Sequence, residues 1–347
     1  MKISILGATG YVGAEIIKLV SKHPNVTIEK LISSSNSGKA FEKIYRNFYK
    51  NLNFDLTADS FDEIVETSDL IFSALPHGLI VDYLKFHHLE QVKIIDLSAD
   101  FRIPNETINQ KWYGFSRTDA QVLNRAVYGL TELNRPKISK SNFIANPGCF
   151  TTCSILSLFP FLEGNFIEKD SIIIDAKSGV SGAGRSQNLD IQFCEVNESI
   201  KAYKVANHRH TPEIEEQLKL LVGLNDLSLT FTPHLIPMNR GILTTIYANL
   251  NTKVDEETLR DYLIEIYKDE YFIRVLPKDV YPETRWVKGS NFFDISIKVD
   301  TRTNRLIIVS AIDNLMKGAA SQAIQNMNLI FGWKENTGID FIPSFPI

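Results

Sequence analysis

Residues 2–20, KISILGATGYVGAEIIKLV, decide the fold of this chain. The first five residues alternate around isoleucine and predict a β-strand, while Ile16, Ile17 and Leu19 recur at helical spacing. Between them stands G-x-x-G-x-x-G, whose glycines allow a tight turn and let backbone N–H groups approach a pyrophosphate at the helix N-terminus. The stretch therefore predicts a dinucleotide site formed by Gly7, Thr9, Gly10, Tyr11, Val12 and Gly13.

The end of the second predicted strand, at residues 27–32, indicates which dinucleotide binds. An NAD site usually has an Asp or Glu here to bind the ribose 2′-hydroxyl. Residues 33–39 are instead SSSNSGK, and their hydroxyls and lysine suit a 2′-phosphate. We expect NADP, contacted by Ser33, Ser35 and Lys39; the alternative is a polar flexible loop without a cofactor role.

Further predicted strands, at residues 69–75 and 93–97, alternate with helical stretches at residues 61–67 and 79–87. This alternation indicates a parallel sheet with crossover helices, and ligands bind at the carboxyl ends of such strands. Pro76 falls at one strand end and is a predicted cofactor contact. Arg102 follows another and is a candidate for binding an anionic substrate, with a surface ion pair as the alternative.

A cysteine stands where a helix is predicted to begin. Pro147 and Gly148 precede Cys149, and an apolar run at near-helical spacing follows it. Unpaired backbone N–H groups at a helix start lower the pKa of a thiol and can hold an oxyanion formed on the group it attacks. Cys149 is therefore the predicted nucleophile. The alternative is a small apolar side chain that fills a corner of the core.

Two polar segments follow in the second half of the chain. Residues 177–185, KSGVSGAGR, come after a predicted strand at residues 171–176, and their glycines allow close approach to a ligand; a mobile linker is the alternative. His208, Arg209 and His210 enter a predicted helix and could supply a general base and an anion clamp. A metal site is disfavoured because no third ligand lies at suitable spacing, and solvated loop histidines are the alternative.

The last third of the chain predicts a second sheet. Residues 229–241 carry two prolines and predict an anion-facing loop that ends near Arg240. The strands expected after it, at residues 242–250, 292–299 and 305–311, favour an antiparallel sheet with one covered face. Residues 254–267 predict an amphipathic helix, and residues 313–325 predict a small-residue helix that packs back on the first domain.

Composition excludes several classes of protein. A net charge of -4 over 347 residues gives no broad basic field for nucleic acid. No apolar run reaches the ~20 residues of a membrane helix, and no signal segment precedes the first strand. Three cysteines are too few for a disulfide framework and fit a reducing compartment. We expect a cytoplasmic protein with a small-molecule substrate.

These patterns define an α/β fold class with two domains. Residues 1–148, together with the C-terminal helix and tail at 314–347, are expected to form a Rossmann NADP-binding domain. Residues 149–313 are expected to form an α+β catalytic and oligomerisation domain with a mixed, largely antiparallel sheet.

Many blocks of the sequence, in order along nearly the whole chain, resemble the N-acetyl-γ-glutamyl-phosphate reductases. That family belongs to a wider group with the aspartate-semialdehyde and glyceraldehyde-3-phosphate dehydrogenases. One departure is that these reductases typically have Tyr-Pro-Thr after the catalytic Cys, where this chain has Phe150, Thr151 and Thr152. The resembling blocks are residues 7–13, 96–102, 128–130, 147–149, 178–185, 208–214, 231–234, 240–241 and 314–320.

The resemblance implies a reaction and roles for these residues. The Cys149 thiolate would attack the acyl phosphate of N-acetyl-γ-glutamyl phosphate, and NADPH would reduce the resulting thioester to the semialdehyde. His210 is the first choice for the acid/base and His208 the reserve. The resemblance places Gly182 and Asn314 near the nicotinamide. On their chemistry alone, Arg102, Arg209 and Arg240, together with Ser181, are candidates for binding the substrate's carboxylate and phosphate. The resemblance also implies a homodimer or homotetramer.

Three alternatives stay open on the sequence. Aspartate-semialdehyde dehydrogenase shares the fold, thiol and cofactor, although the block at residues 208–214 resembles the reductase. A non-catalytic NADP sensor would keep the dinucleotide fold without needing Cys149. An epimerase-like enzyme would need a Tyr-x-x-x-Lys pair in the first domain, which residues 45–49 do not supply. The sequence also leaves open whether the substrate's amino group is acetylated, free or on a carrier.

Overall fold

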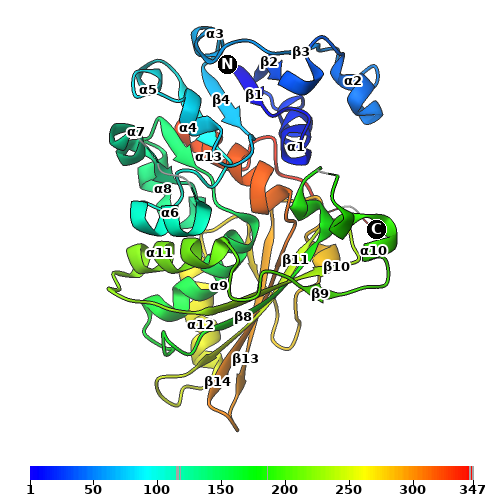
Figure 1. The fold of residues 1–347 in the computed structure, drawn as a ribbon. Helices are drawn as coiled ribbons and strands as arrows, with labels where there is room; N and C mark the ends of the chain where they lie inside the picture. Colours follow the sequence, from blue (N-terminus) through cyan, green and yellow to red (C-terminus); the bar gives the residue numbers. More distant parts are fainter. Residues whose placement is uncertain (115–116, 118, 186, 344, 346–347) are drawn as a thin grey trace. The chain divides into compact units, whose positions relative to one another are not determined.

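The computed structural model describes residues 1–114, 117, 119–185, 187–343 and 345 (Figure 1). The chain divides into two compact units, Met1–Pro147 with Ala319–Asp340, and Gly148–Gly318 with Phe341–Ile347. Residues 314–318, which the sequence groups with the first domain, cluster with the second unit. Within that unit, the Asn314 amide oxygen accepts a hydrogen bond from Gly241 N (2.8 Å), and Asp313 accepts bonds from the N–H groups of residues 315, 316 and 318. The tail positions 344, 346 and 347 of the predicted grouping lie outside the described residues.

The first unit contains a seven-stranded parallel sheet of order β3-β2-β1-β4-β5-β7-β6. Its strands are β1 Lys2–Leu6, β2 Thr27–Ile32, β3 Leu56–Thr57, β4 Leu70–Ser73, β5 Lys93–Asp96, β6 Val127–Tyr128 and β7 Phe143–Ala145. Its helices are α1 Tyr11–Val20, α2 Phe41–Ile44, α3 Phe61–Thr67, α4 Ile80–Tyr83, α5 His88–Gln91, α6 Glu106–Tyr113, α7 Ala120–Arg125, α8 Thr131–Ile138 and α13 Ser321–Ile330, with short 3₁₀ turns at Ser34–Asn36 and Arg46–Phe48. The predicted parallel sheet with crossover helices is therefore confirmed.

Helix α3 begins where the sequence predicts because of a capping box. Ser60 accepts a hydrogen bond from Glu63 N, and the Glu63 carboxylate accepts one from Ser60 N. The single helix predicted at residues 79–87 is wrong, because the chain forms α4 and α5 with a break between them. At the break, the His88 Nδ1 atom accepts a hydrogen bond from Lys85 N (3.0 Å), which turns the chain before α5.

The second unit contains a seven-stranded mixed sheet of order β12-β13-β14-β11-β8-β10-β9. Only β8–β10 and β12–β13 pair in parallel, so the predicted mixed, largely antiparallel sheet is confirmed. Its strands are β8 Ile173–Gly179, β9 Lys201–Ala202, β10 Thr230–Ile236, β11 Ile242–Asn249, β12 Ile273–Val275, β13 Phe293–Asp300 and β14 Arg305–Ile312. Its helices are α9 Cys149–Glu163, α10 Phe193–Val196, α11 His210–Val222 and α12 Glu256–Tyr267, with 3₁₀ turns at Val180–Ala183, Leu189–Ile191 and Thr284–Trp286 and a π-helix at Met316–Ala320.

The Pro-bent loop predicted at residues 229–241 is in large part a strand. Residues of β10 pair along their whole length with β8 on one side. On the other side β9 pairs only with His234 and Leu235. Just beyond β9, Tyr203 N donates to the Pro233 carbonyl (3.1 Å), a bond that does not need an N–H group on proline. The loop proper is the short segment between β10 and β11, at residues 237–241.

Helices α9, α11 and α12 lie on one face of this sheet (Figure 1). Residues that point to this face, such as Ile174, Ile246 and Ile308, are fully buried. Their neighbours on the opposite face, such as Ile173 and Tyr247, are partly exposed. This alternation is the expected signature of a sheet covered on one side.

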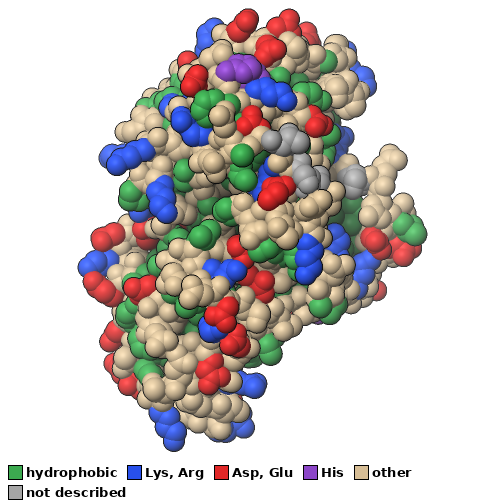
Figure 2. Space-filling view, turned by 60° about the vertical axis from the view of Figure 1, so that its left-hand side comes forward, with side chains coloured by type: hydrophobic (Ala, Val, Ile, Leu, Met, Phe, Trp, Pro, Cys, Tyr) green, Lys and Arg blue, Asp and Glu red, His purple; other side chains and the backbone are tan. Residues whose placement is uncertain are grey.

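Acidic and basic side chains are interspersed over the face shown in Figure 2, without a broad field of either sign. Among the described residues, no helix combines the length and the apolar character that a membrane crossing requires.

Candidate active site

Cys149 is the first residue of α9, and Gly148 before it is the extended N-cap residue. Cys149 is half-buried. Backbone N–H groups in the first turn of a helix have no carbonyl partner within the helix, and the helix dipole is positive there. This position favours a thiolate and offers N–H donors to an oxyanion beside it, as the sequence predicts.

A buried carboxylate ties the start of α9 to α11. Glu213 of α11 is fully buried, and its Oε1 atom accepts hydrogen bonds from Gly148 N (3.0 Å) and from Thr151 Oγ1 (2.8 Å). The Thr151 hydroxyl is thus held in the first turn of α9. Sequence reasoning gave Glu213 no role, although it lies within the resembling block at residues 208–214. The available signal was that Glu213 follows the predicted acid/base His210 by three residues, one helical turn later.

The two predicted imidazoles lie together beside Phe150. The ring centroids of His208 and His210 are 4.8 Å apart, and each ring meets the Phe150 ring edge-on at 5.7 and 5.8 Å. The His208 Nδ1 atom accepts a hydrogen bond from His210 N (3.1 Å), so the proton of the neutral ring is on Nε2. Burial, reinforced by the charges of His210 and Lys204, lowers the pKa of His208 to about 2.

Tyr203 completes this cluster, and the sequence analysis missed it. Its ring packs edge-on against His208 with centroids 5.6 Å apart. Burial raises the pKa of the Tyr203 phenol, and the nearby Cys149 charge raises it further. The phenol therefore stays protonated and can act as a hydrogen-bond donor near the sulfur. No sequence pattern marks this tyrosine, because it lies in an irregular segment.

A second group of predicted residues gathers around Asn314. Its side chain is 2% exposed and donates from Nδ2 to Ser181 Oγ (3.0 Å) while its oxygen binds Gly241 N (2.8 Å). A Cβ atom added at Gly182 would lie 3.7 Å from the same Nδ2. Arg240 precedes Gly241 in the chain, and its guanidinium lies 3.4 Å from the buried carboxylate of Asp313, the residue before Asn314. Ser181, Gly182, Arg240 and Asn314 are therefore neighbours, as a shared site requires.

In the first unit, the glycine turn has the geometry of a pyrophosphate cradle. Gly7 has φ +74°, and a Cβ atom there would collide with the Ala74 carbonyl oxygen. A Cβ atom at Gly13 would collide with the Gly7 carbonyl oxygen, so the turn closes only around glycine. Gly10 is the N-cap of α1. Thr9, Tyr11 and Val12 beside it are partly or fully exposed, so a phosphate can reach the N–H groups at the start of this helix.

The predicted 2′-phosphate residues follow β2. Ser33 is buried and its Oγ atom lies 3.1 Å from Thr9 Oγ1, which joins the glycine turn to the strand end. Ser35 and Lys39 are exposed, and Lys39 Nζ donates to the neighbouring Asn36 side chain (3.2 Å). Pro76 is also exposed, beyond the end of β4. These residues fit a phosphorylated ribose at the carboxyl edge of the sheet.

Arg102 lies in a buried charge network of the first unit. It is 5% exposed and donates from Nη2 to the Leu97 carbonyl (2.7 Å). The buried Asp100 carboxylate accepts bonds from Gly78 N (2.9 Å), and burial together with the Asp96 charge raises its pKa to about 7. Arg102 opposes this rise by its positive charge. Substrate binding by Arg102 stays a prediction.

Known proteins that resemble this chain have the same two-domain organisation. The family model "Semialdehyde dehydrogenase, NAD binding domain" matches residues 2–141, and "Semialdehyde dehydrogenase, dimerisation domain" matches residues 149–314. An N-acetyl-γ-glutamyl-phosphate reductase of Lachnospira eligens is 51% identical over 100% of both chains. A reductase of the same name from Campylobacter jejuni is 50% identical over 98% of each. This chain belongs to the N-acetyl-γ-glutamyl-phosphate reductase family.

Solved structures support the same fold. Aspartate-semialdehyde dehydrogenase II from Vibrio cholerae matches with a TM-score of 0.73 at 16% identity, over 95% of this chain and 98% of that one. An aspartate-semialdehyde dehydrogenase with NADP from Candida albicans matches with a TM-score of 0.70 at 17% identity, over 97% and 99%. The predicted family, fold class and oxidoreductase class are confirmed, and the close full-length relatives are reductases, not aspartate-semialdehyde dehydrogenases.

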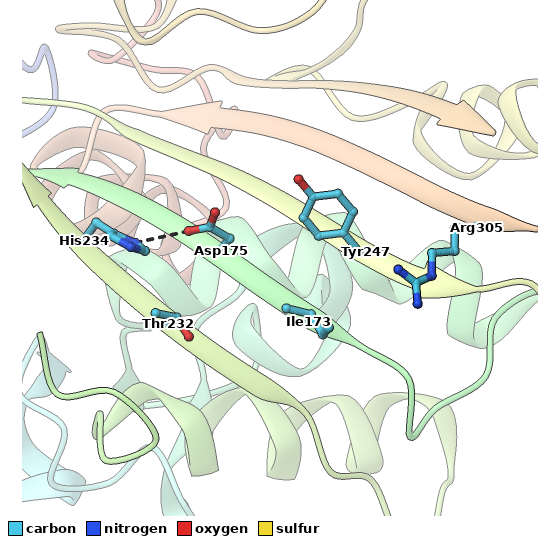
Figure 3. Close-up of a pocket in the computed structure, with 6 residues that line it drawn as sticks. All are labelled: Ile173, Asp175, Thr232, His234, Tyr247 and Arg305. Atoms are coloured by element: carbon cyan, nitrogen blue, oxygen red, sulfur yellow. Dashed lines mark ion pairs between the residues drawn. The ribbon is translucent and has the colours of Figure 1, made fainter. Parts of the chain in front are cut away.

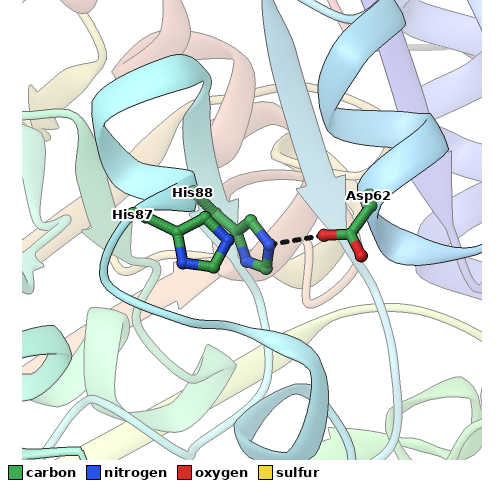
Figure 4. Close-up of side chains that lie close together, drawn as sticks. All are labelled: Asp62, His87 and His88. Carbon is green, nitrogen blue, oxygen red and sulfur yellow. Dashed lines mark hydrogen bonds and ion pairs between the residues drawn. The ribbon is translucent and has the colours of Figure 1, made fainter.

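One further cluster of potential metal ligands lies among the described residues, at Asp62, His87 and His88 (Figure 4). The His88 Nε2 atom lies 2.8 Å from Asp62 Oδ1. Since His88 Nδ1 accepts from Lys85 N, the ring proton is on Nε2, which donates to Asp62. A metal at Nε2 would displace this proton and break the bond to Asp62; as it stands, the pair joins α3 to α5.

Proposed function

We propose that this chain catalyses the NADPH-dependent reduction of N-acetyl-γ-glutamyl phosphate to N-acetylglutamate semialdehyde and phosphate, in arginine biosynthesis. The observation that carries the proposal is Cys149 at the N-terminus of α9, with the imidazoles of His208 and His210 packed against the next residue, Phe150. Full-length relatives that are about half identical carry the name of this reductase. In this chain, the Cys149 thiol lies at a helix start, the position that a nucleophilic thiolate requires.

In the first step, the Cys149 sulfur forms a bond to the γ-carbonyl carbon, and the C–O bond to phosphate then breaks. N–H groups at the start of α9 stabilise the oxyanion of the tetrahedral adduct. The thioester carbon then accepts a hydride, the C–S bond breaks, and the thiolate leaves with the aldehyde formed. Splitting the displacement in this way replaces one difficult step by two easier ones.

The imidazoles handle protons at the oxygen and sulfur atoms. His210 is the proposed acid/base, and a positioned imidazole typically accelerates a reaction by ~10²–10⁴-fold. His208 is held neutral with its proton on Nε2 and is the proposed hydrogen-bond donor, with a reserve role as acid/base. Tyr203 keeps its proton because its pKa is raised, and it is proposed as a second hydrogen-bond donor beside His208.

NADP is the proposed cofactor, and its reduced form, NADPH, supplies the hydride when bound. The glycine turn of residues 7–13 would hold its pyrophosphate, and Ser33, Ser35 and Lys39 its 2′-phosphate. Pro76 would border the cofactor in the first unit, and Gly182 with Asn314 would contact the nicotinamide. Arg209, Arg240 and Ser181, with Arg102 as a further candidate, would bind the substrate's carboxylate and phosphate.

The proposal includes the assembly and location of the protein. Residues 1–148 with the C-terminal helix would bind NADP, and residues 149–313 would carry catalysis and a homodimer or homotetramer interface. The name of the family model that matches residues 149–314 supports the oligomer. A cytoplasmic location follows from the sparse cysteines.

The test is Cys149→Ala, assayed in the direction of semialdehyde oxidation with phosphate and NADP. We expect the wild type to prefer N-acetylglutamate semialdehyde over aspartate semialdehyde and over the free and carrier-linked forms. The variant should lose at least a thousandfold in kcat while it binds NADPH with unchanged Kd. Full activity in the variant would identify a different nucleophile, and an inactive wild type that binds NADPH would favour the NADP sensor.

A further inference from the structure

Gly318 lies in an unusual turn beside Cys149. The π-helix Met316–Ala320 contains it, and its N–H group donates to the Asp313 carbonyl, five residues earlier, at 3.0 Å. Single π-helical turns are rare and occur frequently at functional sites. This turn also contains the point where the chain passes from the second unit to the first.

Glycine is required at position 318 by contact, not by backbone conformation. Its φ lies outside the left-handed range, so a side chain would be tolerated by the backbone itself. A Cβ atom at this position would, however, lie 2.7 Å from the Cys149 Cβ atom and 3.1 Å from its Cα atom. Both are rigid parts of the cysteine, so either Cys149 or the whole turn must move to admit one.

The turn itself is fixed by buried groups. The fully buried Asp313 carboxylate accepts hydrogen bonds from Leu315 N (2.8 Å) and Met316 N (3.0 Å) through Oδ1, and from Gly289 N (2.7 Å) through Oδ2. The fully buried Lys317 ammonium lies 5.9 Å from the centre of the Phe272 ring. Moving the turn would disturb these desolvated charges, which is costly. A side chain at position 318 would therefore displace Cys149 first.

The next residue is held as well. In the first unit, Asn146 Nδ2 donates to the Ala319 carbonyl (3.2 Å), and the Asn146 amide oxygen accepts from Asn326 Nδ2 (3.0 Å). Residues 318 and 319 are therefore each hydrogen-bonded within their own unit.

We infer that Gly318 is a positioning residue for the Cys149 nucleophile. Because Gly318 has no Cβ atom, Cys149 can lie directly against it at the start of α9. This contact determines where the sulfur lies relative to the N–H donors of that helix. The inference rests on the proposed function of Cys149. A displacement of about 1 Å in a reacting group can reduce a rate by ~10²-fold.

The test is Gly318→Ala in a Cys194→Ser background, because the exposed Cys194 would otherwise react with thiol reagents. We expect kcat to fall by ten- to a hundredfold while the Kd for NADPH stays within twofold. The rate of Cys149 alkylation by iodoacetamide, followed from pH 5 to 9, should change at least threefold. A merely structural glycine would not alter this pH profile in a folded protein.

Gly223→Ala is the matched control. Gly223 also lies in the second unit, has φ +75° and has no atom within 4 Å of an added Cβ, so its substitution strains the backbone without touching Cys149. It should lose stability but keep kcat and the alkylation profile. If Gly318→Ala behaves in the same way, the inference is wrong.

Two further measurements separate the possible failures. If Cys149→Ala keeps its activity, the proposed function fails; if it is inactive while Gly318→Ala is normal, only the inference fails. If Gly318→Ala folds poorly, its unfolding is compared with and without Cys149→Gly, which removes the clashing Cβ atom. The alanine should destabilise less in the Cys149→Gly background, and equal destabilisation in both would overturn the inference.

Discussion

At the scale of single residues, His208 links the site's chemistry to the pH dependence of stability. Its pKa of about 2 in the folded protein lies far below the ordinary value of 6.5, chiefly because the ring is buried. Below pH 6.5, His208 therefore binds a proton in the unfolded chain but stays neutral in the folded protein. The resulting stability is fully present above pH 6.5 and is lost as the pH falls below it.

We predict that acidification destabilises the wild type more than His208→Asn, in which the amide oxygen can still accept from His210 N. One proton contributes about 1.4 kcal/mol per pH unit, so the two proteins should diverge by about 1 kcal/mol between pH 7 and pH 5.5. Urea unfolding at both pH values measures this. His23, whose pKa burial also lowers, is present in both proteins and cancels. Parallel pH dependences would show that His208 is not held neutral.

At the scale of elements, the contact between α9 and α11 depends on Glu213. Glu213→Ala would leave the buried Gly148 N–H without its acceptor, while the Thr151 hydroxyl would keep the Gly148 carbonyl as an acceptor (2.7 Å). Such a loss destabilises by about 1–3 kcal/mol, so we predict a destabilisation in this range, with a smaller loss for Glu213→Gln, which retains an acceptor oxygen. Because α11 begins at His210, kcat should fall as well.

Denaturant unfolding and steady-state kinetics check the Glu213 prediction. The control is Leu220→Ala, on the same helix, where the side chain is 63% exposed. That variant should change stability by less than about 0.5 kcal/mol. A Glu213→Ala protein as stable as this control would show that α9 and α11 are joined by apolar packing alone.

Elements with strong local signals were predictable from the sequence. Helix α3 has its own capping box at Ser60, and the predicted residues 61–67 match it. Cys149 follows Pro147 and Gly148, which stop the preceding strand, so the helix start was visible locally. The sheet of the first unit follows from apolar runs alternating with helical periods.

The features that the sequence did not reveal depend on partners distant in the chain. Pro233 argues against a strand until β9 is known to cover so little of β10. Glu213 resembles an ordinary helix residue until Gly148, 65 positions earlier, is seen against it. The π-turn around Gly318 is set by the buried Asp313 and by Cys149, and no local period encodes either contact.

At the scale of the whole molecule, the partly exposed sheet face of the second unit bears on assembly. Ile173, 42% exposed, lies there with Thr232, Tyr247 and Arg305 around a hollow of about 440 Å³ (Figure 3). On the same face, His234 Nδ1 lies 3.1 Å from Asp175 Oδ1. Apolar side chains beside charges of both signs make a surface that can pair with a second copy of itself, as a two-fold interface requires.

We predict that Ile173→Asp weakens the homo-oligomer proposed for this chain. The substitution would place a charge in the middle of the face, where interfaces of about 800 Å² per partner tolerate few unpaired charges. Light scattering during gel filtration should give a multiple of 39.3 kDa for the wild type and a shift toward 39.3 kDa for the variant. Leu220→Asp is the control, since Leu220 is 63% exposed on α11 and lies away from this face. If the two variants have the same mass as the wild type, the oligomer forms through another surface, and the sheet face must be exposed for a different reason.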